Sequence, residues 1–175
     1  TIHPEAYRVS IEAMEQHDAD IVRFGYHSVT DGTPADSGNV TGAPAVYDSP
    51  EQLRHFAKAT FGQPFAGDNE FDPGGSAWNA VYRLDTINDN NLRFVSERDL
   101  ISEDYIFSYQ YYLLSKSLVV FPREYYNYRV VPGSVSRSNH LGKMERVENY
   151  CRYVSGMLRR DSFSPRDDRY AQGFC

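Results

Sequence analysis

Two adjacent carboxylates, Glu103 and Asp104, stand at the predicted start of a helix and have the chemistry of a general base. A carboxylate within about 3 Å of a hydroxyl can accept its proton as the hydroxyl attacks. Neighbouring side chains on a helix diverge by about 100°, so at most one of the two faces a substrate directly. The alternative is that both carboxylates only complement the positive end of the helix dipole.

Aromatic and polar side chains that could bind a ligand occur at two further places. Trp78 and Asn79 form the first, and the alternating Tyr126 and Tyr128, with Arg129 on the opposite face, form the second. Each place also has a purely structural explanation. Trp78 can be a core residue, and alternate tyrosines usually make one packed face of a sheet.

The spacing of apolar residues predicts an α/β chain that positions these groups. Ser49 and Gln52 have the pattern of a capping box, and Ser102 is the expected cap of the helix that carries Glu103 and Asp104. Helices are expected at residues 4–17, 49–61, 83–91, 103–115 and 144–158, strands at 20–28, 118–121 and 125–131, and loops at 30–48, 62–75 and 159–175.

Two helices have a predicted apolar face. In the first helix, Tyr7, Ile11 and Met14 recur at helical spacing. In the helix after Ser102, the expected buried stripe is Ile106, Tyr109 and Leu113. Residues 30–48 have no apolar period, so they are expected to form a loop or a short hairpin excursion instead of a core element.

Composition narrows the class of protein. The 175 residues suffice for one domain with its own core. The net charge of −6 argues against nucleic-acid binding, and no apolar run approaches the ~20 residues of a membrane span. Cys151 and Cys175 form no metal-ligand cluster, so reduced thiols in a cytoplasmic protein are the simplest interpretation.

Ordered motifs in the second half of the chain resemble family 2 glycosyltransferases of the GT-A type. They include Trp78-Asn79 with Ala80 where a lysine is usual, the Glu103-Asp104 pair and the Tyr-x-Tyr-Arg strand. The matching blocks lie at residues 76–83, 92–94, 102–107, 126–129 and 133–136. The resemblance implies a partial GT-A fold, a mixed sheet with flanking helices that lacks the donor-binding half.

The resemblance also implies site residues. Asp104 would be the general base and Glu103 its orienting partner. Substrate-binding roles would fall to Trp78, Asn79, Tyr128, Arg129, Ser134 and Ser136, with His140 as a weak metal-ligand candidate. The serines could equally satisfy the local backbone, and a lone histidine in a polar loop is usually solvated.

The family's metal-binding Asp-x-Asp is expected outside this sequence, immediately before Thr1. Asp18-Ala19-Asp20 has the same spacing but precedes a strand instead of closing one, so we do not expect it to bind metal. Mg²⁺ or Mn²⁺ would act in the full-length enzyme, with none bound by this chain alone. Residues 1–160 would be the C-terminal part of the transferase domain and 161–175 a polar tail.

The implied activity is transfer of a sugar from a nucleotide-sugar donor to a glycan or lipid-linked acceptor, as in bacterial-like polysaccharide biosynthesis. The transfer is expected to invert the configuration at the anomeric carbon. The enzyme is expected in the cytoplasm, where it could lie at the inner face of the membrane. The isolated chain would be inactive, and its sheet edge could drive self-association. The alternative is a non-catalytic carbohydrate-binding or protein-interaction domain.

Overall fold

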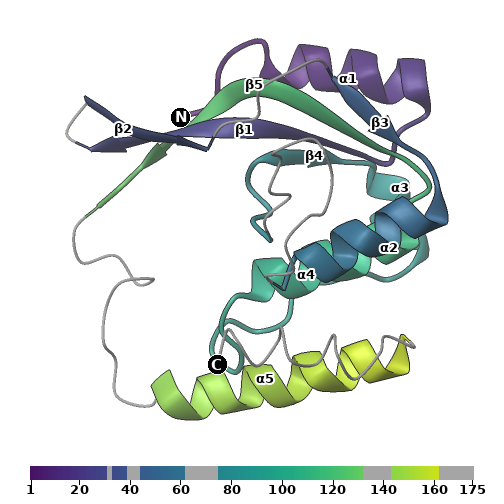
Figure 1. Cartoon of the computed structure of the whole chain (residues 1–175), viewed down its shortest axis with the longest axis vertical. Coiled ribbons are helices and arrows are strands. Elements are labelled where there is room, and N and C mark those ends of the chain that lie inside the picture. The colour runs from purple at the N-terminus through teal and green to yellow at the C-terminus, as the bar shows by residue number, and fades with distance from the viewer. Residues whose placement is uncertain (31–32, 39–43, 62–74, 132–142, 162–175) are drawn as a thin grey trace.

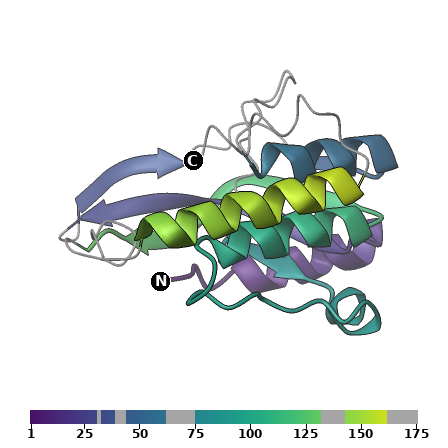
Figure 2. The same ribbon diagram turned by 90° about the horizontal axis from the view of Figure 1, so that it is seen from below.

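The computed structural model describes residues 1–30, 33–38, 44–61, 75–131 and 143–161, which form a mixed sheet with helices on both faces (Figure 1). Helix α1 (Ala6–His17) covers one face. On the other face lie α2 (Pro50–Ala59) and α4 (Glu103–Leu114), with α5 (Lys143–Arg160) outermost (Figures 1 and 2). The expected α/β class with flanking helices is confirmed.

The sheet has β1 and β5 at its centre. Strand order is β2-β1-β5-β3, and β4 also pairs with β1. β1 and β5 run parallel, and the other pairs are antiparallel. The strands are β1 (Ile21–Thr30), β2 (Thr33–Gly38), β3 (Ala45–Tyr47), β4 (Ala80–Tyr82) and β5 (Leu118–Arg129). The first residues of β1 and β5 are buried on both faces, as is usual for parallel strands between helices.

Helix α1 packs with a different face from the one its apolar spacing predicts. Tyr7 and Ile11 are 56% and 50% exposed, whereas Ala6, Ser10 and Ala13 are buried. The expectation for the first helix is therefore wrong for Tyr7 and Ile11, whereas Met14 is partly buried against the core as predicted. Small side chains lie against the sheet, and Ala13 packs in a core cluster with strand residues Val22 and Val119.

The larger core lies on the opposite face of the sheet and is built around α4. It joins apolar residues of β1 and β5 to aromatic residues of α2, α4 and α5. Ile106 and Tyr109 are buried as predicted, but the buried stripe is wider and includes Tyr111 and Tyr112. The expected capping box of α2 is present, with Gln52 N–H donating to the Ser49 hydroxyl at 3.2 Å.

The structure refines two strand expectations. Of the loop and the hairpin considered for residues 30–48, the hairpin is present, because β2 pairs with β1, but the short strand β3, which pairs with β5 at the sheet edge, was not predicted. The two predicted runs at 118–121 and 125–131 are one strand, β5, whose register against β1 shifts between Phe24 and Tyr26. The short apolar runs end where this irregularity falls, so spacing alone divides the strand.

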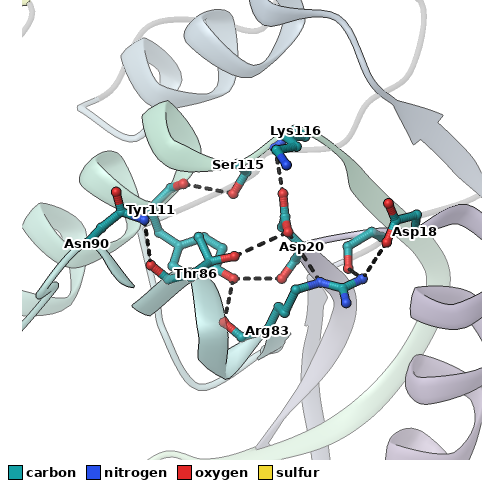
Figure 3. Close-up of polar contacts among 9 residues, drawn as sticks. Asp18, Asp20, Arg83, Thr86, Asn90, Tyr111, Ser115 and Lys116 are labelled. Atoms are coloured by element: carbon teal, nitrogen blue, oxygen red, sulfur yellow. Dashed lines mark hydrogen bonds and ion pairs between the residues drawn. The ribbon is translucent and has the colours of Figure 1, made fainter. Parts of the chain in front are cut away.

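A polar cluster around Asp20 ties the start of β1 to three neighbouring segments (Figure 3). Its carboxylate accepts the Lys116 backbone N–H at 2.6 Å and the Thr86 hydroxyl at 3.2 Å, and it pairs with Arg83 Nε at 3.3 Å. The Tyr111 hydroxyl donates to the Asp20 carbonyl at 2.7 Å. These bonds align β1 with α4 and β5.

Cys151 on α5 is disulfide-bonded in this structure, so the expectation of reduced thiols is wrong for this residue. Among the described helices, none is both long and apolar enough to cross a membrane. The short helix α3 (Leu84–Asp89) completes the described elements and follows β4 directly.

Candidate acid–base site at the start of helix α4

Asp104 lies half-buried in the first turn of α4. Its Oδ1 accepts the backbone N–H of Tyr105 at 3.0 Å. Ser102 does precede the helix, but it adopts a left-handed conformation with φ 53° and makes no capping hydrogen bond. Ser102 therefore holds the predicted N-cap position but its side chain makes no capping hydrogen bond. The Asp104 carboxylate instead supplies an acceptor to the first turn.

The surroundings of Asp104 suit a base. Burial raises the pKa of the Asp104 carboxyl above its ordinary value, and the negative charge of Glu103 raises this pKa further. The Tyr105 amide and the positive charge of Arg23 act in the opposite direction. A carboxylate with a raised pKa is a stronger proton acceptor, which general base catalysis requires.

Asn79 enters this site through a buried arginine, Arg23 on β1. Arg23 Nη1 donates to Asn79 Oδ1 at 3.1 Å, and Nη2 donates to the Ser76 carbonyl at 2.8 Å and to Ser108 Oγ at 3.3 Å. Ser108 in turn donates to the Gly75 carbonyl at 2.8 Å. Residues 75–79 are thereby fixed between β1 and α4.

The signal for Arg23 was present in the sequence. It stands among Ile21, Val22 and Phe24, in a strand apolar on both faces. Such a strand is buried on both sides, so a charged residue within it must lie in the interior.

Trp78 is the centre of an aromatic cluster made with Tyr26, Tyr126 and Tyr128. Its ring centroid lies 4.8 Å from those of Tyr26 and Tyr126 and 5.0 Å from that of Tyr128, against which it stacks. Trp78 is partly buried and Tyr128 is 37% exposed. The cluster thus combines packing with an accessible aromatic surface, and Tyr26 is the member that sequence analysis missed.

The remaining predicted residues are not brought into the Asp104 network by any described contact. Arg129 is exposed at the end of β5, opposite Val29. Ser134, Ser136 and His140 lie outside the described residues.

The described residues do not fit the implied divalent metal. Within them, no three His, Cys, Asp or Glu side chains are grouped as ligands. Both Asp20 oxygens interact with protein donors, and Asp18 Oδ1 pairs with Arg83 Nη2 at 3.0 Å. We therefore assign Asp18 and Asp20 to structure and derive no chemical step through a metal.

In comparisons by sequence, no protein-family model and no curated protein matches this chain. In comparison by structure, the fold is similar to part of the TarS structures from S. aureus. Three of the similar structures, all of S. aureus TarS, match most of this chain.

The structure of TarS 1–349 with UDP-GlcNAc matches 99% of this chain and 44% of that chain, with a TM-score of 0.65 and 18% identity. TarS 1–349 by itself gives a TM-score of 0.58 at 17% identity over 99% of this chain and 42% of that chain. The structure of TarS 1–349 with UDP gives a TM-score of 0.52 at 15% identity and covers 90% of this chain and 44% of that chain. The chain therefore spans less than half of these TarS structures, and the similarity establishes its fold.

Proposed function

We propose that this chain is the acceptor-side part of a family 2 glycosyltransferase of the GT-A type, and that Asp104 is its general base. The observation that carries the proposal is the Asp104 environment: a half-buried carboxylate on a rigid helix turn, with a pKa raised by burial and by Glu103. The glycosyltransferase fold supports the same assignment.

The proposed reaction is an inverting transfer. Asp104 accepts the proton of an acceptor hydroxyl while that oxygen bonds to the anomeric carbon and the bond from this carbon to the nucleoside diphosphate breaks. Glu103 acts on Asp104 through its charge. Arg23 holds Asn79 in place through a hydrogen bond, and Trp78 and Tyr128 form an aromatic surface. Together these groups would orient a sugar ring against the Asp104 carboxylate.

Donor, acceptor and metal extend the proposal beyond the described residues. TarS has been solved with UDP-GlcNAc and with UDP, which supports a nucleotide sugar as the donor here. A glycan or lipid-linked acceptor follows from the proposed family. Because the chain spans less than half of TarS, we place the donor-binding half and its Mg²⁺ or Mn²⁺ in the full-length protein and expect no turnover by the 175 residues alone.

The test is substitution of the base in the full-length protein. Asp104→Asn keeps the acceptor for the Tyr105 amide but removes the basic group, so kcat for sugar transfer should fall by about 10²-fold or more. The exposed Asp99, in the turn before α4, gives the matched control Asp99→Asn, which should transfer at the wild-type rate. Near-normal transfer by Asp104→Asn would remove Asp104 from this role.

A further inference from the structure

Arg23 is a charged residue in the interior of the fold, at 0% exposure, on central strand β1. Removing a guanidinium from water is costly unless polar partners and opposite charge compensate. Its neutral acceptors are Asn79 Oδ1, the Ser76 carbonyl and Ser108 Oγ. Its Cζ also lies 5.4 Å from the centroid of the Tyr112 ring, a cation–π distance.

The contact with Ser108 relates Arg23 to the proposed base. Ser108 follows Asp104 by four residues on α4, and side chains at i and i+4 lie on the same face of a helix. Asp104 therefore belongs to the helix face that Arg23 contacts. In keeping with this placement, the positive charge of Arg23 lowers the pKa of the Asp104 carboxyl.

Other titratable groups that act on Asp104, or that Asp104 acts on, come from three elements. Glu103 on α4 raises the pKa of Asp104. Burial raises the pKa of Tyr82 on β4 and of Tyr150 on α5, and the charge of Asp104 raises both further, so these are neutral phenols near pH 7. Arg23 on β1 is the cation of this set, and its charge acts against the larger effects of burial and Glu103 on the pKa of Asp104.

We propose that Arg23 is a positioning residue that holds Asp104 in its carboxylate form and fixes Ser76 and Asn79 against helix α4. The same guanidinium does both. Nη1 donates to Asn79, and Nη2 donates to Ser76 and to Ser108, which lies on the helix face of Asp104. The inference rests on the proposed function, in which Asp104 must be ionised to accept a proton.

The experiment compares Arg23→Gln and Arg23→Met, which remove the charge, with Arg23→Lys, which keeps it, all in the full-length protein. Loss of the charge should make Asp104 easier to protonate. We expect kcat/KM for sugar transfer to fall about tenfold more at pH 6 than at pH 8 in the neutral variants, whereas Arg23→Lys keeps the wild-type pH profile. Arg83→Met, which disrupts the Asp20 cluster, is the control and should lower stability without changing the profile.

A second readout does not depend on activity. The ¹³C chemical shift of the Asp104 carboxyl, followed from pH 3 to 8, should titrate at higher pH in Arg23→Gln than in wild type. An unchanged titration in a folded neutral variant would overturn the inference, even if Asp104→Asn abolishes transfer. If the Asp104 titration shifts in Arg23→Gln but Asp104→Asn transfers sugar normally, the electrostatic coupling between Arg23 and Asp104 stands and the proposed function is rejected.

Folding of the neutral variants is checked by circular dichroism and thermal melting. Should neither fold, the titration is made on Arg23→Lys, whose ammonium retains the charge but loses the planar fork. A wild-type-like Asp104 titration in that variant supports the inference, and a titration at higher pH overturns it.

Discussion

The ring of Tyr105 occupies the space into which a side chain at position 75 would project. A Cβ at Gly75 would clash with Cγ and Cδ1 of the Tyr105 ring. Glycine at this position therefore allows residues 75–79 to approach the first turn of α4, where Tyr105 follows the proposed base directly.

Gly75→Ala should consequently destabilise the fold by about 2 kcal/mol or more, because an added methyl must displace an aromatic ring. Gly156 in α5 is the matched control, since a Cβ added there would meet no described residue beyond its own stretch of helix within 4 Å. Gly156→Ala should stabilise by about 0.5–1 kcal/mol through helix propensity. Urea unfolding measures both, and equal effects of the two substitutions would contradict the close contact.

Asp104→Asn should raise thermal stability near pH 8 although it abolishes catalysis. The pKa of Asp104 is raised in the folded state, so its ionised form is less favourable in the folded than in the unfolded chain. Asp104 therefore contributes to the free energy of unfolding at low pH, and this contribution is lost as the pH rises through the folded-state pKa of Asp104. Melting temperatures of the two proteins should therefore converge near pH 3 and separate at pH 8; a constant difference across this range would be evidence against a raised pKa.

Tyr111 and Tyr150 are both buried tyrosines whose hydroxyls have different surroundings. Tyr111 donates to the Asp20 carbonyl at 2.7 Å and lies 3.1 Å from the Arg83 carbonyl. The Tyr150 hydroxyl has no hydrogen-bond partner among the described residues. Tyr111→Phe should cost about 1–2 kcal/mol, and Tyr150→Phe should be neutral or slightly stabilising. Denaturant unfolding midpoints measure both variants. A lower midpoint for Tyr150→Phe than for Tyr111→Phe would refute these hydrogen-bond assignments.

The two aspartates of the Asp-x-Asp string should differ in their effect on stability. Asp20→Asn places a side-chain amide against the donors Lys116 N–H and Thr86 O–H. The free energy of unfolding should fall by about 2 kcal/mol, because hydrogen bonds to a charged acceptor are lost. Asp18, whose side chain is 94% exposed, should tolerate Asn within about 0.5 kcal/mol. Adding Mn²⁺ should leave the melting temperature of each protein unchanged; a Mn²⁺-dependent rise that both substitutions remove would instead identify a metal site.

Tyr128 should contribute to acceptor binding and little to the chemical step. Its partly exposed ring stacks on Trp78 at 5.0 Å, so Tyr128→Ala in the full-length protein should raise KM for the acceptor about 3- to 30-fold, as expected for loss of one stacking contact. The exposed Tyr7 on α1 provides the control Tyr7→Ala. A wild-type KM for Tyr128→Ala would leave the aromatic cluster a packing feature only.

The sequence by itself determined the local elements of this protein. Interactions within a few residues set three of these features. They are the Ser49 capping box, the helix that begins at Glu103, and the alternation in β5 that puts buried Tyr125 on the opposite face from Tyr126 and Tyr128. Such interactions repeat with the period of the backbone, so they can be predicted from spacing.

Tertiary structure alone decided how these elements combine into a site. Arg23 meets Asn79 across 56 residues and Ser108 across 85, and α1 packs through Ala6 and Ala13 because small side chains admit close approach to the sheet. Spacing along one element carries no information about which distant segment lies against it. The candidate base and the burial of Arg23 were therefore predictable from sequence, whereas the contact of Arg23 with the helix face of the base became evident only in the fold.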